Sequence, residues 1–471
     1  MSVVNVLDYG AKGDGATLDT AAIQAAIDQV HEHGGGTVIV PGGYTFLCSG
    51  IRLKSYVNLH LEPGSLLQTS TQQADYAGRE AGEAHSRFSC LIEADGAEQI
   101  SITGFGRIDG CGAAFIEKDL GGYIYSVKRW RPGLIFFLDC RQVTLRDVTL
   151  SESPWWTVHL VGCEDVLIHG IHIYNDLKMP NCDGIDPDHC RNVRISDCQI
   201  QCADDCIVLK NTAKFADRGS CRDITVTGCT LMCTATAVKI GTESVSDFEN
   251  ITVTACTIKS SSRGLGIQLR DQGSVRNVIF TNCTIETRLF EEHYWGKAEP
   301  IHISALHRFS YGNAQPPAWN PTNALGSVKH IMYSDILCRS ENGIVIIGEP
   351  EIAIESIRFR NVMLNIDKWT KWRGGELDRR PVDGPAHAVR DGKSDPGVVA
   401  HTFSGAYIEH ARDVELNGVR VTWGQNLPDY YAHALEARHA PGLKLENFQG
   451  EAPHPERGDA IVIEEGDFCQ S

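Results

Sequence analysis

Short runs in which apolar and polar residues alternate recur along the middle of the chain. Each run follows a four-residue phrase that ends in valine or isoleucine, as in Cys190-Arg191-Asn192-Val193. Successive copies begin at positions 140, 163, 190, 221, 248 and 275, so the steps are 23, 27, 31, 27 and 27 residues. After a gap, the phrase reappears at positions 328, 354 and 411. A period in the twenties that carries alternating runs predicts a solenoid of short strands.

The steps leave no room for long helices, which narrows the class of solenoid. We predict an all-β fold, a right-handed parallel β-helix whose coils stack and bury side chains in ladders. A second column of cysteines follows the phrase eight residues later, at Cys198, Cys229, Cys256 and Cys283. Because stacked thiols behave as small apolar groups, we expect these cysteines in the core rather than in disulfides or a metal site.

The ends of the repeat differ from its middle. Gly34-Gly35-Gly36 follows residues 17–33, whose apolar positions recur at helical spacing. We expect this amphipathic helix to cap the open end of the coil stack, within a cap and first coil at residues 1–45. Residues 365–400 break the repeat, so we expect a long loop insertion there. We predict that residues 1–471 form one β-helix domain.

Three aspartates supply the strongest candidate chemistry. Asp204 and Asp205 follow Asp183 by 21 and 22 residues. An offset close to the coil period places the two segments about one coil apart, where neighbouring strands lie roughly 4.8 Å from each other. Carboxyl groups that close cannot all ionise freely, and an acid beside carboxylate bases is what glycoside hydrolysis requires. Because adjacent strand residues point to opposite faces, the backbone must bend if both Asp204 and Asp205 reach the site.

Charge and composition restrict the partners. The 43 basic and 60 acidic residues give a formal net charge of −17, which argues against a nucleic-acid surface. No apolar run approaches about 18 residues, so we expect no membrane span. The chain opens with Met1-Ser2-Val3 and no apolar leader, and it holds 17 cysteines. We therefore expect reduced thiols and a cytoplasmic protein, with a removed leader as the alternative, and leave the oligomeric state open.

These motifs resemble glycoside hydrolase family 28, the polygalacturonase family within the pectin-lyase-like superfamily. Asn181-Cys182-Asp183 and Asp204-Asp205 are similar to the family's two aspartate motifs, and Tyr294-Trp295-Gly296 to a segment common in its bacterial members. The resemblance implies an inverting O-glycosyl hydrolase that acts on pectin-derived oligosaccharides without a cofactor or metal. It implies Asp204 as the general acid, and Asp183 and Asp205 as the pair that holds and deprotonates water.

The chain departs from the family where polygalacturonases hold the carboxylate of their substrate. The family's histidine aligns with Thr236, and the two cations of its Arg-Ile-Lys motif align with Gly266 and Gln268. Losing both cations removes charge-assisted hydrogen bonds of roughly 1.5–3 kcal/mol each. We therefore predict a neutral sugar, such as rhamnose, at the cleavage site. Lys239, Arg263 or Arg270 could restore a cation, so an exo-polygalacturonase or rhamnogalacturonan hydrolase is the alternative.

Six further residues are candidates for substrate binding through hydrogen bonds or ring stacking: Lys210, Lys239, Glu243, Gln268, Arg270 and Trp295. An insertion that folds over one end of the cleft would make the enzyme exo-acting; an exposed loop and an oligomer contact are the other interpretations. Two other functional classes stay open, a calcium-dependent eliminase of the pectate-lyase type and a non-catalytic carbohydrate-binding β-helix.

Overall fold

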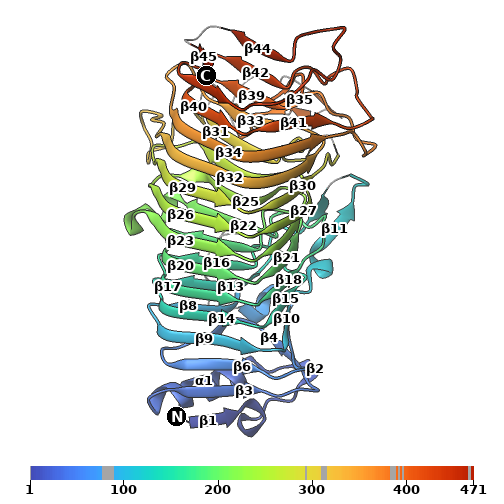
Figure 1. The fold of residues 1–471 in the computed structure, drawn as a ribbon. Helices are drawn as coiled ribbons and strands as arrows, with labels where there is room; N and C mark the ends of the chain where they lie inside the picture. Colours follow the sequence, from blue (N-terminus) through green and yellow to red (C-terminus); the bar gives the residue numbers. More distant parts are fainter. Residues whose placement is uncertain are drawn as a thin grey trace. The chain divides into compact units, whose positions relative to one another are not determined.

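The computed structural model describes residues 2–76, 90–122, 124–291, 294–308, 316–381, 389–390, 393–394, 397–464 and 468–470. The chain forms two compact units, each of which is described by itself. Unit 1 comprises residues 1–207 and 228–230, and unit 2 comprises residues 208–227 and 231–471. Within each unit, short strands stack into ladders (Figure 1).

Unit 1 consists of three parallel ladders. Its first ladder contains β5 (Ile51–Arg52), β8 (Cys90–Asp95), β13 (Gly133–Leu138), β16 (Val158–Val161) and β19 (Ile185–Asp188). The second contains β1 (Ser2–Asn5), β3 (Gly36–Val40), β6 (Val57–Leu61), β9 (Glu98–Gly104), β14 (Arg141–Arg146), β17 (Glu164–His169) and β20 (Arg191–Ser196). The third contains β2 (Asp14–Leu18), β4 (Thr45–Cys48), β7 (Leu66–Thr69), β10 (Arg107–Asp109), β15 (Thr149–Ser151), β18 (His172–Tyr174) and β21 (Gln199–Cys202). Outside the ladders lie an antiparallel hairpin, β11 (Ile116–Asp119) with β12 (Tyr125–Val127), and the 3₁₀ turns Val6–Tyr9, Gln73–Tyr76 and Gly112–Phe115.

Unit 2 repeats the same plan. Its first ladder contains β22 (Ile207–Asn211), β25 (Thr236–Ser244), β28 (Arg263–Leu269), β31 (Ile301–Ala305), β33 (Ile344–Ile347), β39 (Ala406–Glu409), β42 (Leu435–Arg438) and β44 (Ile461–Glu464). The second contains β23 (Cys221–Thr227), β26 (Phe248–Thr254), β29 (Val275–Thr281), β32 (Val328–Ser340), β34 (Ile354–Ile366), β40 (Ala411–Asn417), β43 (Leu443–Glu446) and β45 (Phe468–Gln470). The third contains β24 (Thr230–Cys233), β27 (Thr257–Ser261), β30 (Thr284–Thr287), the second halves of β32 and β34, and β41 (Arg420–Trp423). A 3₁₀ segment at Ala213–Arg218 and the short hairpins β35 (Glu376–Asp378) with β38 (Val398–Ala400) and β36 (Val389–Arg390) with β37 (Lys393–Ser394) lie outside them.

Alternation along the strands places the core inside the coils. In β20, Val193 and Ile195 are buried while Arg194 between them is exposed. The same positions pair from coil to coil, so Val166 lies beside Val193 and Ile168 beside Ile195. Every cysteine whose surroundings are described carries a free thiol, and all of these except Cys111 are buried. The solenoid and the apolar cysteine columns are therefore confirmed.

The N-terminal helix is confirmed with slightly shorter bounds. It is α1 (Thr20–Glu32), and its buried residues are Ile23, Ala26, Ile27 and Val30. The helix packs against β1, β3 and β6, which belong to the first coils of unit 1 (Figure 1). An apolar stripe on a short helix thus covers the start of the stack, where strand edges would otherwise be exposed.

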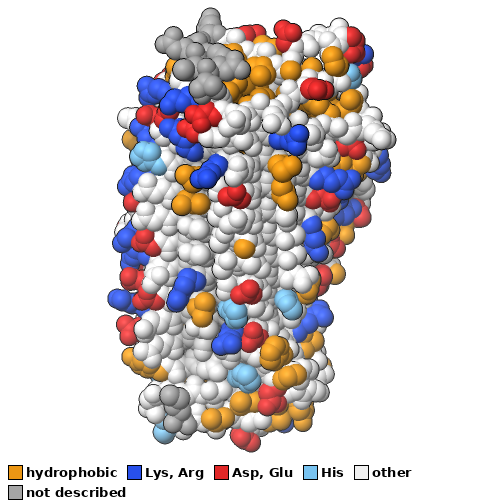
Figure 2. Space-filling model, in the orientation of Figure 1, with side chains coloured by type: hydrophobic (Ala, Val, Ile, Leu, Met, Phe, Trp, Pro, Cys, Tyr) orange, Lys and Arg blue, Asp and Glu red, His pale blue; other side chains and the backbone are white. Residues whose placement is uncertain are grey.

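The surface carries both signs of charge. On the face drawn in Figure 2, acidic and basic side chains are interspersed rather than gathered into one large basic region. Across the part of the chain that the structure describes, the helices are too short and too polar to cross a bilayer.

Candidate active site

The three aspartates converge in unit 1. Asp183 lies in the loop between β18 and β19, and Asp204 and Asp205 lie between β21 and β22. Each contributes a carboxylate oxygen to a group whose members all lie within 4.8 Å of one another. Asp183 and Asp205 are buried and Asp204 is half-buried. The expected bend is present, because residues 203–206 are not in a strand and both neighbouring carboxylates reach the same point.

Backbone hydrogen bonds join the two aspartate segments. The Gly184 N–H donates to the Asp205 carbonyl at 2.9 Å, and the Ile185 N–H donates to the Cys206 carbonyl at 2.9 Å. One coil earlier, the Thr157 N–H donates to the Asp183 carbonyl at 2.9 Å. The approach at Gly184 is so close that an added Cβ would lie 2.4 Å from the Cys206 carbonyl oxygen. Only glycine lets the segments meet at this distance, which explains the glycine after Asp183.

Buried polar side chains hold the Asp183 loop in place through hydrogen bonds. Asn175 accepts from the Ser153 N–H at 2.9 Å and donates to the Thr157 hydroxyl at 2.8 Å and the Cys182 carbonyl at 3.1 Å. Because these three groups come from different turns, one amide ties the loop to its neighbours. An Asn side chain has two N–H donors and one acceptor oxygen, and both donors of Asn175 are used here.

Arg131 is a second support. Its guanidinium donates to the Pro154 and Pro180 carbonyls at 2.7 Å each and to Asn181 Oδ1 at 3.2 Å, and it lies 4.4 Å above the Trp155 ring. Burial lowers the pKa of Arg131 to about 10, so the group stays charged at neutral pH. It therefore holds the residues just before Asp183 with charge-assisted hydrogen bonds.

The spacing of the carboxylates bears on the stereochemistry. Inverting glycosidases usually separate their two carboxyl groups by roughly 6.5–9.5 Å and retaining ones by roughly 5–5.5 Å. The oxygens here approach within 4.8 Å, so the spacing alone does not favour inversion. The same three oxygens are also close enough to bind a divalent cation, for which carboxylate oxygens are suitable ligands. A test of function must therefore distinguish inverting hydrolysis, retaining hydrolysis and a reaction that depends on a bound cation.

Three of the predicted substrate-binding residues lie together in unit 2. Lys210 on β22 is buried, and its Nζ lies 3.5 Å from Glu243 Oε2 on β25. Burial acts to raise the pKa of Glu243, but the charges of Lys210, Lys239 and Arg308 outweigh it and lower that pKa to about 2. Glu243 is therefore ionised within a group of cations. Arg308 itself donates to both oxygens of Asp271, at 2.9 and 2.8 Å.

Gln268 and Trp295 occupy different surroundings in the same unit. Gln268 on β28 is buried and pairs in register with Gly241 on β25 and Ser304 on β31. Trp295 is 40% exposed, and the Arg380 guanidinium lies 4.7 Å from its ring centroid. Both stay predicted contacts, with one face of the Trp295 ring already covered by an arginine.

The prediction that Arg270 binds substrate is wrong. Arg270 is fully buried, and each of its five N–H groups has an acceptor in unit 2. The acceptors are the Leu269, Arg379, Arg380 and Pro381 carbonyls and the Ser304 hydroxyl. Three of these carbonyls belong to the predicted insertion, so Arg270 binds that segment instead of a sugar.

The insertion packs onto the first ladder of unit 2. Within the predicted insertion, residues 382–388, 391–392 and 395–396 lie outside the described residues. We call residues 369–381 and 397–403 the strap; its last three residues lie just beyond the predicted insertion. Leu377 and Val399 of the strap pack against Leu306, Val345, Ile347 and Tyr407. The exposed-loop interpretation is therefore wrong for these residues, because their apolar side chains cover the outer face of β33 and β39.

Charged groups fix the strap further. Arg263 pairs with both oxygens of Glu299, at 3.1 and 3.2 Å, and donates to the Asp378 carbonyl at 3.1 Å. Asp378 accepts from Arg380 Nε and Nη2, each at 2.9 Å, and from the Gly296 N–H at 2.7 Å. Burial acts to raise the pKa of Asp378, but Arg380 and Arg263 lower it well below its usual range. The strap is thus held by buried, hydrogen-bonded ion pairs as well as by apolar packing.

Comparison with known proteins now decides the family. The profile of glycosyl hydrolases family 28 matches residues 63–365. The chain belongs to this family. A second profile, described as rhamnogalacturonase A/epimerase, pectate lyase-like, matches residues 3–81. The resemblance predicted from the aspartate motifs is confirmed.

Individual proteins with polygalacturonase names are similar to this chain in sequence or in fold. A probable polygalacturonase of Vitis vinifera is 34% identical over 219 residues, which are 44% of this chain and 44% of that protein. The match therefore spans less than half of this curated relative. The exopolygalacturonase of Thermotoga maritima has a TM-score of 0.66 at 24% identity and covers 78% of this chain and 87% of its own. The family 28 exopolygalacturonase of Yersinia enterocolitica has a TM-score of 0.68 at 20% identity, with 95% and 78% covered. These neighbours are right-handed parallel β-helices, and the predicted fold class is confirmed.

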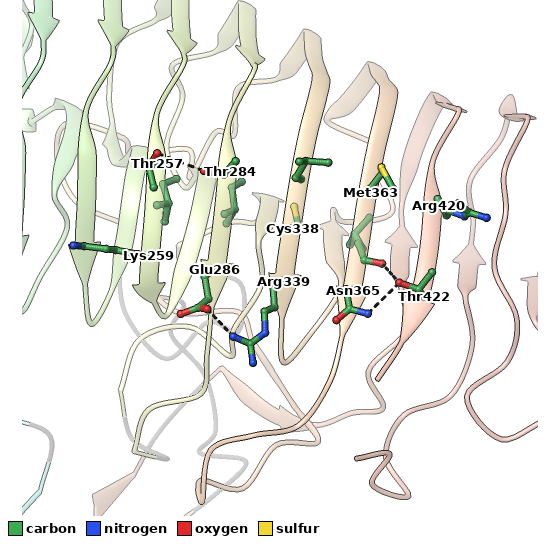
Figure 3. A pocket seen from close by; sticks show the side chains of 14 residues that line it. Thr257, Lys259, Thr284, Glu286, Cys338, Arg339, Met363, Asn365, Arg420 and Thr422 are labelled. Carbon is green, nitrogen blue, oxygen red and sulfur yellow. Dashed lines mark hydrogen bonds and ion pairs between the residues drawn. The ribbon is translucent and has the colours of Figure 1, made fainter. Parts of the chain in front are cut away.

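A groove elsewhere in unit 2 lies apart from the residues predicted for the family 28 chemistry. It has a volume of about 440 Å³ on the third ladder (Figure 3). Leu337 and Met363 are exposed there, Arg339 pairs with Glu286 at 2.9 Å, and Asn365 donates to the Thr422 hydroxyl at 3.2 Å. None of the predicted site residues lines it, so volume alone does not identify the active site.

Sequence reasoning missed Arg131, Asn175 and Arg308. Arg131 and Arg308 lie in connections between strands, where the repeat carries no information about position. Asn175 follows β18 directly, and its only signal is a polar residue where the coil turns. Their partners come from other coils, so their roles depend on contacts that one coil's pattern does not contain.

Proposed function

We propose that this family 28 protein hydrolyses glycosidic bonds in pectin-derived oligosaccharides. The observation that carries the proposal is the convergence of Asp183, Asp204 and Asp205 within 4.8 Å. Membership of a glycosyl hydrolase family supports it, as do the polygalacturonase and exopolygalacturonase names of the similar proteins.

In the proposed reaction, the three carboxyl groups divide the work. Asp204, the most exposed of the three, protonates the leaving glycosidic oxygen. Asp183 and Asp205 hold a water molecule and remove its proton as the oxygen attacks the anomeric carbon. Such general acid and base steps each contribute about 10²–10⁴-fold to the rate. We propose inversion on the strength of the family, since the carboxylate spacing does not decide it.

We further propose that a neutral sugar, such as rhamnose, occupies the cleavage site. Gly266 and Gln268 stand where the family's cations align, and the two nearby arginines are already occupied. Arg263 is paired with Glu299, and Arg270 with four carbonyls and a hydroxyl. This weakens the alternative in which either arginine binds a galacturonate carboxylate. Rhamnogalacturonan-type oligosaccharides, which contain neutral sugars beside acidic ones, fit this composition.

We propose exo action because the strap covers part of the first ladder of unit 2. Lys239 and Gln268, two predicted contacts, lie on the outer face of β25 and β28. Beyond them on the same ladder, strap residues cover β33 and β39. A chain that contacts Lys239 therefore cannot continue along this face past the strap. An enzyme with such a closed end releases short products from a chain end.

Product analysis tests the proposal directly. Purified protein is incubated with neutral-sugar glycosides, rhamnogalacturonan oligosaccharides and oligogalacturonides, and NMR follows the first anomer released. We expect inverted product from the neutral-sugar substrates. Galacturonate as the main product would overturn the specificity, and retained configuration would overturn inversion.

A variant pair tests the site. Asp204→Asn should lower kcat by about 10³-fold or more with little change in binding, because it removes the proton donor. The control is Asp197→Asn, which removes an exposed carboxylate of the same unit and should leave activity unchanged. Unchanged turnover in Asp204→Asn would overturn the assignment. Activity that chelators abolish, with an unsaturated product absorbing in the ultraviolet, would instead indicate a cation-dependent eliminase at the three carboxylates.

A further inference from the structure

The groove on the third ladder of unit 2 has an apolar centre. Its lining side chains project from five strands paired in the order β27, β30, β32, β34 and β41 (Figure 3). Neighbouring strands lie roughly 4.8 Å apart, so the groove is about 19 Å long. Leu337 and Met363, which pair in register on β32 and β34, are 53% and 47% exposed. Adjacent apolar side chains that stay exposed in a hollow are typical of binding surfaces.

Three cations lie along the same groove, one on every second strand. They are Lys259 on β27, Arg339 on β32 and Arg420 on β41, and all three are exposed (Figure 3). Two strand spacings separate the backbone at each cation from the next, a distance of roughly 9.6 Å. Arg339 donates to Glu286 at 2.9 Å, yet its side chain is 55% exposed, and a guanidinium has five donors. The groove therefore presents cationic donors to solvent at regular intervals.

The charge of the groove is opposite to that of the whole chain. The chain carries a formal net charge of −17, so the protein as a whole repels polyanions. The charged residues that line the groove are the three cations and one carboxylate, Glu286. Because salt screens exposed charges beyond about 8–10 Å, an anion in the groove interacts mainly with these four groups. The groove therefore favours an anionic ligand that also has apolar surface for Leu337 and Met363.

The spacing of the cations indicates which kind of anion fits. An extended chain of six-membered sugar rings advances by about one strand spacing per ring, and each ring has an apolar C–H face. Cations on every second strand therefore match carboxylates on every second ring. Glu286 lies on the strand between Lys259 and Arg339, and it would repel a carboxylate on the intervening ring. Asn365, on the strand between Arg339 and Arg420, is neutral.

We infer that this groove binds an acidic polysaccharide in which uronates alternate with neutral sugars. Such a chain places its carboxylates against Lys259, Arg339 and Arg420 and its C–H faces on the apolar centre. Rhamnogalacturonan, in which acidic and neutral sugars alternate, is the matching probe. The inference goes beyond the proposed function, because it assigns a second carbohydrate-binding site that lies wholly in unit 2 and uses none of the residues proposed for hydrolysis.

Oxidation of Met363 measures occupancy of the groove. Met332, on the second-ladder part of β32 and outside the groove, is 42% exposed and serves as the internal control. Full-length protein carrying Asp204→Asn, which prevents hydrolysis of the probe, is treated with dilute peroxide over a range of oligosaccharide concentrations. Mass spectrometry follows the sulfoxide at both methionines.

Three probes are compared: rhamnogalacturonan oligosaccharides, oligogalacturonides with the same number of rings, and rhamnogalacturonan oligosaccharides whose carboxyl groups have been reduced to alcohols. We expect saturating rhamnogalacturonan oligosaccharide to slow the oxidation of Met363 about fivefold or more and to leave Met332 unchanged. Oligogalacturonides should bind more weakly, because Glu286 faces their additional carboxylates. The carboxyl-reduced probe should protect neither methionine.

Removal of the cations should weaken this protection. The triple variant Lys259→Gln, Arg339→Gln, Arg420→Gln should raise the apparent Kd about tenfold or more, because each exposed charge pair contributes up to about fivefold. The control is Arg412→Gln, an ion-paired arginine on β40 in the second ladder that is 52% exposed and should keep the wild-type Kd. Glu286→Gln should raise the affinity for oligogalacturonides more than that for rhamnogalacturonan. If the triple variant fails to fold, Arg420→Gln alone should still raise the Kd about threefold.

The possible results separate binding in the groove from hydrolysis. Unprotected Met363, equal protection by the carboxyl-reduced probe, or an unchanged Kd in the folded cation variants would each overturn the inference. Equal affinity for oligogalacturonides would overturn the alternation of the sugars. Slow oxidation of Met363 without oligosaccharide, together with dimers that the triple variant abolishes in sedimentation, would show instead that a second copy of the chain covers the groove. Protection of Met363 in a protein whose wild type hydrolyses no substrate would refute the proposed function and support the inference.

Discussion

Replacing Gly184 by alanine should separate the aspartate segments without touching a carboxylate. The added Cβ would lie 2.4 Å from the Cys206 carbonyl oxygen and 2.8 Å from Ile200 Cγ2. Real Cβ atoms essentially never approach other atoms below 3.0 Å, so the segments must move apart by at least about 0.6 Å. The Gly184 N–H to Asp205 carbonyl bond, 2.9 Å long, then lengthens to about the limit of a hydrogen bond.

Two magnitudes follow for Gly184→Ala. Overpacking in a well-packed interior costs roughly 1–3 kcal/mol of unfolding free energy. A misplacement of 1 Å can cost about 10²-fold in rate, so a shift of about 0.6 Å should lower kcat/KM by about tenfold or more. The stability loss alone cannot produce this, because a folded majority remains at 25 °C for a protein with several kcal/mol of stability.

The assay compares urea unfolding and kcat/KM on the shortest cleaved oligosaccharide for wild type, Gly184→Ala and Gly405→Ala. Gly405 is a matched control in unit 2, because its added Cβ would lie 2.5 Å from the Ala434 carbonyl oxygen and 2.6 Å from a Val421 methyl. We expect similar stability losses in both variants and a catalytic loss only in Gly184→Ala. A folded Gly184→Ala protein with kcat/KM within about twofold of wild type would refute the reasoning that this contact sets the carboxylate geometry.

Three further predictions concern stability. Asn175→Ala removes three buried hydrogen bonds and should cost about 2–3 kcal/mol in urea unfolding, whereas a loss below about 0.5 kcal/mol would contradict its supporting role. The pKa of Glu243 is lowered from 4.5 to about 2, so its ion pairs stabilise the fold above pH 4.5 and are lost as pH falls toward 2. The Glu243 side chain is 40% exposed, so we discount the effect to about 1 kcal/mol; Glu243→Gln should remove this pH dependence, and an unchanged slope would count against it. The Tyr333 hydroxyl is buried without a hydrogen-bond partner among the described residues, so Tyr333→Phe should raise the unfolding free energy by about 1 kcal/mol, and a lower thermal midpoint would disprove this.

The fold could be predicted because its signal is repeated. Each coil carries the same alternation, so an irregular coil does not hide the period, and residues such as Val193 and Ile195 are buried as their pattern predicts. The helix near the N-terminus was equally predictable, since its stripe and the glycines that follow are local features. The actual bounds, Thr20–Glu32, differ by a few residues because helix ends depend on capping contacts.

The candidate site was predictable only in part. An offset of 21 residues in a repeat of similar length was enough to place Asp183 beside Asp204 and Asp205. Sequence reasoning also assigned Arg270 to the substrate, as a cation that could replace those missing at Gly266 and Gln268. In the structure, the strap, more than 100 residues later, accepts three of that arginine's five hydrogen bonds, and Leu269 and Ser304 accept the other two.

The sequence by itself determined the class of fold, the family and the juxtaposition of the three aspartates, because these depend on period and local pattern. Tertiary structure decided which polar residues are occupied and which faces are covered. Arg131 and Asn175 support the Asp183 loop, and Arg270 binds the strap, through contacts between segments whose spacing follows no period. The physical reason is that a strand's alternation depends on its own backbone, whereas a hydrogen bond to a distant carbonyl depends on where the rest of the chain passes.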